Sequence, residues 1–476
     1  MMRSAKAGIG PVMGLTDMGV DARANAVGTP DGERDERLVA ALRLCVAATI
    51  VSTPLGFWLR LESPSQSQRA VFAAMGLLCG FLVAGAVLAR PRLAPRVTGA
   101  WWVAWGLQWA VLLLAAARSA ESSYALSSAM LTLSGMAWFA AIVVALRPGL
   151  GLRSMAALWV ILGVVLSLHG LAQSLGWGVA REVFLKSRAV SLLGHPSHLA
   201  SALVPIFFIA LSGKTNGRGC GRWAHQAVLG VLGVGLLLTG TRAAWLAVGL
   251  GLCAHEWLRR RAGARPTASK RRIALWIGAT AIAVTLFTLP NPWFSPRFDL
   301  AQRLVSGVEV RSRLYSWLIA VDMARERPLL GHGPGAYAAR FWEYVDRRQA
   351  SPAGQWFEPM VISMDGIPPA YPHNEFLSLA CESGLVGLAA FMGLVACGWS
   401  AAVRLSKNSP GAVSDSRERG VSMDVAPALG AGLVACLIDA SFAFPFQLAI
   451  SWAGFVFILA LLCSMDQRNI AKTLTS

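Results

Sequence analysis

Long apolar runs are the feature of this sequence that most constrains its fold. Between residues 38 and 465, runs of roughly 20 residues with few charges follow one another, separated by polar segments. A helix of that length spans the hydrocarbon core of a bilayer. Because lipid offers the backbone no hydrogen-bond partners, runs that cross it must be helical. The sequence therefore predicts an all-α, polytopic membrane protein with about twelve transmembrane helices.

The predicted spans and loops divide the chain into five parts. We predict a cytoplasmic tail over 1–37, nine spans over 38–290, a large periplasmic loop over 291–375, three spans over 376–465 and a cytoplasmic tail over 466–476. Only a few residues around Thr241 separate the seventh and eighth runs, which predicts a tight hairpin of two spans. The individual runs are 38–59, 70–89, 97–117, 124–146, 154–175, 196–212, 226–240, 242–258, 273–290, 376–402, 425–443 and 447–465.

The basic residues predict the orientation of these spans. The net charge is +18, and alternate loops carry most of it, for example the arginines and lysines between Arg259 and Arg272. The short loops on the other side carry few, such as Arg60, Arg69 and Arg118. Cytoplasmic loops of membrane proteins are enriched in this way, so both chain ends are predicted to be cytoplasmic. Since the charge follows membrane topology and no basic stretch alternates with stacking aromatics, we exclude nucleic acid as a partner.

The large outer loop, 291–375, is predicted to contain amphipathic helices. Leu314, Trp317, Leu318 and Val321 recur at helical spacing, and Pro328 ends the run. Such a helix would lie on or near the membrane surface. The sequence GHGPG at 331–335 superficially resembles a phosphate-binding loop, but no strand precedes it and no Lys-Ser/Thr pair follows. We interpret it as the turn that ends the amphipathic helix.

Three arginines on predicted outer segments are candidate phosphate ligands. Arg242 stands at the tip of the hairpin, Arg188 precedes the sixth span, and Arg313 lies on the predicted amphipathic helix. A guanidinium can hold phosphate oxygens in a two-pronged grip. Each arginine also has an ordinary interpretation, because Arg242 could anchor its hairpin at the interface, Arg188 could be a loop charge, and Arg313 could occupy the polar face of its helix.

The histidines offer one candidate base. His373 lies where the large loop re-enters the membrane, and an imidazole with its ordinary pKa near 6.5 suits general-base chemistry, although a structural role is also possible. His195 and His198 have a metal-like spacing, but Pro196 lies between them and no acidic ligand is near, so capping and packing are the favoured interpretation. We predict no metal and no cofactor. Asp439 is an acid well inside a late span and therefore a further candidate.

In chain order, these segments resemble the O-antigen ligase and polymerase family of bacterial inner-membrane proteins. The family pattern is an arginine four residues before a tryptophan, a Pro-leading Gly-rich turn, a His-Asn pair and a Glu-x-Gly that opens a span. This chain has Arg313 and Trp317, then PLLGHGPGAY at 328–337, then HNEFLSLACESGLVG at 373–387. TGTRAAWLA, which includes Arg242, matches an earlier family segment. The resemblance is close over about 310–395 and loose over about 185–250.

The resemblance implies a metal-independent glycosyltransferase that takes its glycan from an undecaprenyl-pyrophosphate carrier at the periplasmic face. In the ligase branch the acceptor is the lipid A-core of lipopolysaccharide. It implies that His373 and Arg313 are catalytic and that Arg188 and Arg242 bind the pyrophosphate. To these we add one more predicted phosphate ligand and three secondary candidates, namely Arg311, Asn374, His195 and His198. The arginines would take the place of a metal in neutralising the leaving group.

The branch of the family stays open. Polymerases often carry two long outer loops and protein O-oligosaccharyltransferases tend to carry an extra C-terminal part, whereas this chain has one long loop and a short predicted tail. Both comparisons favour the ligase. A more distant alternative is a bicarbonate-type anion transporter, for which charges near the membrane midplane or broken helices would be expected.

Overall fold

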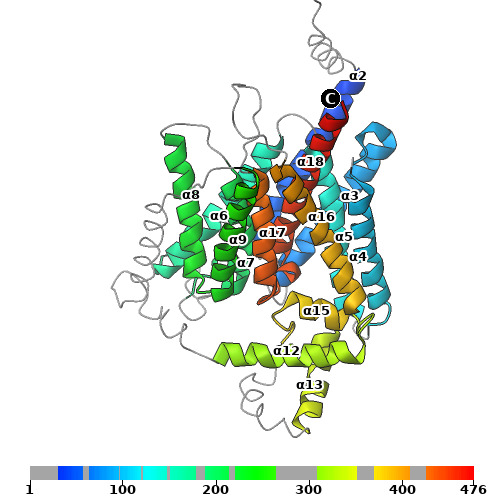
Figure 1. Ribbon diagram of the computed structural model, residues 1–476, viewed down its shortest axis with the longest axis vertical. Helices are drawn as coiled ribbons and strands as arrows, with labels where there is room; N and C mark the ends of the chain where they lie inside the picture. The colour runs from blue at the N-terminus through cyan, green and yellow to red at the C-terminus, as the bar shows by residue number, and fades with distance from the viewer. Residues whose placement is uncertain are drawn as a thin grey trace, which may run out of the picture.

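The computed structural model describes residues 30–56, 64–95, 97–119, 122–146, 151–177, 188–213, 220–263, 308–350, 369–407 and 425–475. Within these residues every regular element is an α-helix or a short 3₁₀ helix, in agreement with the all-α prediction. Figure 1 shows a bundle of long helices with one helix, α12, lying across its lower end. The C-terminal end of α18 lies at the opposite end of the bundle.

The long helices follow the apolar runs. They are α2 (Pro30–Leu55), α3 (Pro64–Ala89), α4 (Gly99–Ala116), α5 (Ser122–Ala145), α6 (Gly151–Ser174), α7 (Pro196–Ser212), α8 (Cys220–Leu238), α9 (Arg242–Arg261), α16 (Gly384–Lys407), α17 (Val425–Ala440) and α18 (Ala449–Thr475). The shorter or surface helices are α12 (Val308–Glu326), α13 (Ala336–Gln349), α15 (Glu375–Glu382) and the 3₁₀ helices η2 (Pro91–Leu93), η4 (Ser191–Leu193) and η6 (Pro445–Gln447).

Seven of the described helices are long and apolar enough to cross a membrane. They lie in α2, α3, α4, α5, α6, α16 and α18, and α7, α8 and α17 contain shorter apolar helices. Every predicted span except 273–290, which lies outside the described residues, and 376–402, which two helices share, coincides with one helix or part of one. Helix α2 begins at Pro30 and α18 continues to Thr475, so both helices extend into the segments predicted as tails, 1–37 and 466–476.

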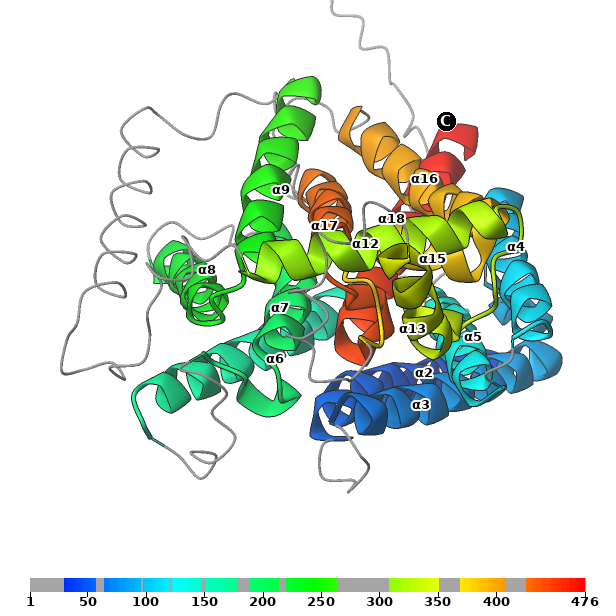
Figure 2. The same cartoon turned by 90° about the horizontal axis from the view of Figure 1, so that it is seen from below.

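Helix α18 forms the centre of the bundle. Of its most apolar stretch, 94% is buried inside the protein, and Figure 2 shows it among the other long helices rather than at the rim. Its Phe457 contacts Trp138 and Trp159, and its Trp452 contacts Trp105, with ring centroids 5.9–6.4 Å apart. Such aromatic pairs stabilise beyond their buried area, so this core fixes the helices that carry the outer segments.

The predicted tenth span, 376–402, is broken and not one continuous helix. Helix α15 ends at Glu382 and α16 begins at Gly384, whose φ of 70° is left-handed. A Cβ on Gly384 would lie 2.1 Å from the carbonyl oxygen of Leu329, so only glycine fits. The first amide groups of α16 bond to the Pro-leading turn, as Leu385 N donates to Pro328 O at 2.7 Å. Contacts between two distant segments, and not local composition, therefore set this break.

Helix α12 is present as predicted, and it packs on the protein through apolar residues other than those of the predicted apolar face. The side chains of Tyr315, Ile319 and Met323 are fully buried against α13 and α15, whereas Leu314 is 49% exposed. The buried face and the predicted face, which contains Leu314 and Trp317, are both apolar, so helical spacing alone does not show which one packs on the protein. Trp317, on the predicted face, still contacts Phe442 after α17 at 6.1 Å between ring centroids.

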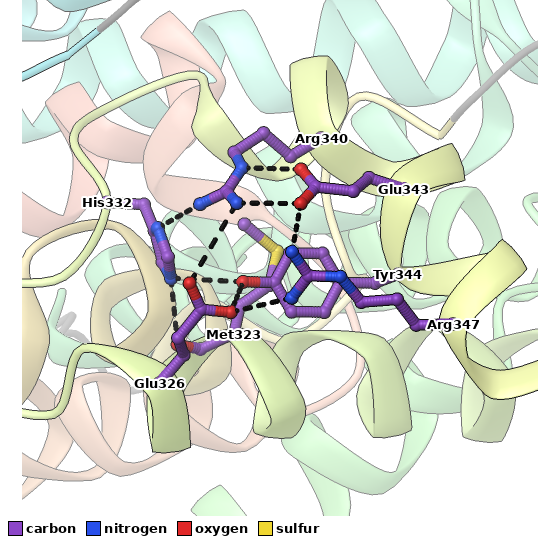
Figure 3. A network of polar contacts seen from close by, with 7 residues as sticks. All are labelled: Met323, Glu326, His332, Arg340, Glu343, Tyr344 and Arg347. Carbon is purple, nitrogen blue, oxygen red and sulfur yellow. Dashed lines mark hydrogen bonds and ion pairs between the residues drawn. The ribbon is translucent and has the colours of Figure 1, made fainter. Parts of the chain in front are cut away.

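The GHGPG segment forms the turn between α12 and α13, as predicted. His332, its second residue, bonds to both helices (Figure 3). The ring nitrogen Nδ1 accepts a hydrogen bond from Arg340 at 2.5 Å, and Nε2 donates to the Met323 carbonyl at 3.0 Å. Burial lowers the pKa of His332, as expected for a ring that uses its neutral form to make both bonds. Glu326 accepts from the Tyr344 hydroxyl at 2.5 Å, and this bond lowers the pKa of Glu326.

Candidate functional site

The candidate residues gather at the end of the bundle beneath which α12 lies (Figures 1 and 2). Helices α3, α7 and α9 begin at this end, and α17 finishes there. Helix α15 lies between α12 and the bundle. The structure thus brings together segments that are up to about 300 residues apart in the chain, as the bond between Arg69 and Tyr371 shows.

Arg188 is bound to the hairpin turn that precedes Arg242. Its Nε donates to the Thr239 carbonyl at 2.6 Å and its Nη2 donates to the Thr241 hydroxyl at 3.0 Å. Gly240, between them, has a left-handed φ of 61°, and a Cβ there would lie 3.2 Å from Arg188 Nε. Arg242 is the first residue of α9 directly after this turn. The two arginines predicted to bind phosphate therefore lie on contacting segments.

His373 packs against Phe444, the residue before η6. The two rings are 5.1 Å apart, and His373 has a left-handed φ of 55°, which is uncommon for a residue with a side chain. Tyr371 and His198 contact the same phenyl ring, at 5.1 and 5.7 Å. Such a backbone outlier is kept only where surrounding contacts determine it. Phe444 is thus the shared support of the candidate base and its neighbours.

The secondary candidates have clear local roles. Asn374 caps α15, because its side-chain oxygen accepts from Leu377 N at 3.0 Å. His195 caps α7 through Nδ1, which accepts from Ser197 N at 3.3 Å. His198 packs its ring on His195 at 5.1 Å. These contacts agree with the capping and packing interpretation of the histidine pair.

Arg313 faces the end of α17. Its guanidinium lies within electrostatic reach of Asp439, whose side chain is 1% exposed. Asp439 precedes Phe442 and Phe444, which contact Trp317 of α12 and His373 respectively. The helix of Arg311 is described, but its side chain lies outside the described part of the structure.

Two buried carboxyl groups on α15 complete the surroundings. Glu375 accepts from Phe446 N at 2.8 Å and from Gln447 N at 3.2 Å, which ties α15 to η6. Glu382 accepts from the amide of Gly335 at 2.9 Å and so caps α13 from another segment. Burial raises the pKa of Glu375 to about 7 and that of Glu382 to about 8. Both are therefore largely protonated when the surrounding pH lies below these values.

A small cavity with both polar and apolar lining residues lies beside these carboxyl groups. Its volume is about 60 Å³, and it is lined by residues of α4, α5, α15 and η6 that include both glutamates, Gln108 and Ser378. Among the described residues, Gln108 Oε1 and Ser378 Oγ have no hydrogen-bond partner. The described side chains contain no group of three or more His, Cys, Asp or Glu that could hold a metal ion.

The Pro-leading turn and the Glu-x-Gly kink to which it binds lie in a stretch of sequence that matches a known protein family. A family model described as O-antigen ligase matches residues 227–392. Residues 227–392 of the chain therefore carry an O-antigen ligase family domain. Members of this family are membrane glycosyltransferase-like enzymes that act on lipid-linked polysaccharides in general. No curated protein matches the chain.

The O-antigen ligase match covers part of the candidate site directly. It contains Arg242, Arg313 and His373, whereas Arg188 and His198 precede it and join the site only through tertiary contacts. The match runs from α8 into α16, so it includes Gly384 and the hydrogen bond from Leu385 N to Pro328 O at the kink. Together with the apolar helices, the match indicates a multi-pass membrane protein.

Sequence reasoning missed two parts of the candidate site. No candidate residue was predicted in the turn with Phe442 and Phe444, because nothing in its composition shows which residues pack on it. Arg69 was counted as an ordinary outer-loop charge, yet it lies within α3 and bonds to Tyr371. Its place in the second turn of an apolar helix was a usable signal, since charges inside spans are rare unless they have a partner.

Proposed function

We propose that the chain is an O-antigen ligase that transfers a polysaccharide from an undecaprenyl-pyrophosphate carrier to the lipid A-core of lipopolysaccharide. The active site would face the periplasm from the bacterial inner membrane, with both chain ends in the cytoplasm. The observation that carries the proposal is the convergence at one end of the bundle. There Arg188 binds the turn before Arg242, Arg313 lies within electrostatic reach of Asp439 near the end of α17, and His373 packs on Phe444 just after α17.

The proposed reaction is a single displacement at the anomeric carbon. His373 takes the proton of the acceptor hydroxyl, whose oxygen forms a new bond to that carbon. The bond from the carbon to the pyrophosphate oxygen breaks, and its electron pair leaves with the lipid pyrophosphate. Arg188, Arg242 and Arg313 stabilise the charge that develops on the leaving group. Attack from the opposite face inverts the anomeric configuration, and the step needs no metal.

The main proposed contribution of the arginines is to bind the phosphates of the donor. A guanidinium forms two parallel hydrogen bonds to phosphate oxygens, and these bonds are stronger in a site that excludes water. Arg188 donates hydrogen bonds to the hairpin turn through Nε and Nη2. We therefore assign it two roles, which are to hold the turn that precedes Arg242 and to bind the phosphate. Arg242 and Arg313 supply the remaining positive charge.

Deletion of the gene, followed by gel analysis of lipopolysaccharide, tests the proposal. A ligase deletion removes every ladder band and leaves lipid-linked polymer in the membrane. A polymerase of the same family would leave core molecules with a single added repeat, and a protein O-oligosaccharyltransferase would leave the ladder intact. Complementation by the wild-type chain, but not by a His373→Ala variant of equal abundance, ties the phenotype to the site.

A further inference from the structure

Arg69 uses only part of its hydrogen-bonding capacity within the protein. It lies near the start of α3, and its Nη1 donates to the Tyr371 hydroxyl at 3.0 Å. The other two nitrogens, Nε and Nη2, are buried and bond to none of the residues that the structure describes. A buried donor on a cation that stays unpaired costs about 1–3 kcal/mol or more, so these atoms call for a partner.

The two unpaired nitrogens lie on the same edge of the guanidinium. Nε–H and one N–H of Nη2 point in parallel, which is the geometry that holds two oxygens of a phosphate or carboxylate. The nearest carboxyl groups are already engaged. Glu375 accepts from the backbone and side chain around Gln447, and Glu382 Oε1 accepts from Gly335 and Tyr337. The unpaired edge of the guanidinium therefore suits an oxyanion from outside the chain.

The position of Arg69 joins the two halves of the candidate site. Its neighbour Gln68 donates to the Leu192 carbonyl at 3.4 Å, close along the chain to Arg188. On the other side, Tyr371 packs on Phe444, which also supports His373. An anion at the unpaired edge would thus lie between the pyrophosphate-binding arginines and the segment of the proposed base.

We propose that Arg69 is a fourth pyrophosphate-binding arginine, which holds an oxyanion through Nε and Nη2 while Nη1 positions Tyr371. Binding of the anion fixes the guanidinium, and the bond to Tyr371 then steadies the segment that carries His373. The identity of the anion as the donor's pyrophosphate rests on the proposed function. The pairing of an oxyanion with Arg69 rests on the geometry of the guanidinium alone.

The test measures anion affinity apart from transfer. Full-length protein in detergent is titrated with inorganic pyrophosphate, and binding is followed by thermophoresis for the wild type, Arg69→Lys and Tyr371→Phe. Lysine keeps the charge but cannot form the two-pronged contact, so Arg69→Lys should weaken binding about 10- to 100-fold. Tyr371→Phe should bind pyrophosphate within about twofold of the wild type. Arg118→Lys, an exposed arginine just beyond α4, is the matched control.

The outcomes separate this inference from the proposed function. Loss of affinity in Arg69→Lys alone supports it, even in a chain that turns out to transfer no glycan. Unchanged pyrophosphate affinity in folded Arg69→Lys overturns it, even where ligation by the wild type is established. Melting curves without ligand report folding. If the lysine variant is unfolded, the double variant Arg69→Met/Tyr371→Phe replaces it. This double variant removes the buried guanidinium together with the Tyr371 hydroxyl to which Arg69 donates. Loss of pyrophosphate affinity then supports the inference, and unchanged affinity overturns it.

Discussion

Replacement of Glu382 by glutamine should remove a pH dependence from the stability of the protein. Glu382 is buried, caps α13 through the Gly335 amide and has a pKa raised to about 8 by burial. Glutamine keeps a side-chain oxygen that accepts the same bond but cannot ionise. The folded wild type must therefore keep a proton on this group or place a charge in a buried site as the pH rises.

The sign and size follow from linkage. Because the folded pKa lies above the ordinary value of 4.5, the stabilising contribution of Glu382 is complete below pH 4.5 and is lost progressively as the pH rises to about 8. Each pH unit in this window changes stability by about 1.4 kcal/mol. Between pH 5.5 and 8 the wild type should lose about 3 kcal/mol relative to Glu382→Gln.

Thermal melting of both proteins in the same detergent, followed by tryptophan fluorescence, measures this difference. The difference between the two melting temperatures should be smallest near pH 5 and should grow steadily towards pH 8.5 in favour of the glutamine variant. Glu343→Gln, an exposed carboxyl on α13, serves as the control and should show no such trend. A difference that stays constant across the range would refute the reasoning, because it would mean that Glu382 titrates alike in both states.

Three further predictions concern the kink, the phosphate grip and the metal. Gly384→Ala should lower the free energy of unfolding by more than about 2 kcal/mol, since φ is left-handed and the new Cβ would overlap Leu329 O. The control is Gly249→Ala, whose new Cβ would meet nothing within 4 Å and which should be neutral or stabilising in the same melting experiments. Arg242→Lys should lose most transfer activity although its charge is kept, and near-normal ligation by this variant would mean that Arg242 only anchors the hairpin. Transfer should persist in EDTA, and abolition with rescue by a divalent cation would contradict the metal-independent mechanism.

The helices were predictable from the sequence because their cause is local. Length and apolarity specify a span, and the turn at Gly240 was predicted from the few residues between two runs. Arg188 and Arg242 were expected on the same face from the loop charges, and the structure places their segments in contact. Patterns that depend on neighbouring residues alone therefore predicted the helices and this turn.

The features that the sequence did not reveal depend on contacts between distant segments. The break at Gly384 arises where Leu329 and Pro328 bond to it, and the apolar run through it gives no sign of this. The buried face of α12 depends on which of two apolar stripes meets α13. Arg69 owes its interest to Tyr371, about 300 residues later. Single-sequence patterns carry no record of these partners, so tertiary structure was needed to find them.

Reconstituted transfer with a His373→Ala variant tests the central claim most directly. Purified protein would receive undecaprenyl-pyrophosphate-linked polymer as donor and lipid A-core as acceptor, and the rate of product formation would be measured together with donor affinity. The account predicts transfer by the wild type and a loss of about 10²- to 10⁴-fold in rate for His373→Ala, with donor affinity unchanged. A folded His373→Ala variant that binds donor normally and transfers at the wild-type rate would contradict it.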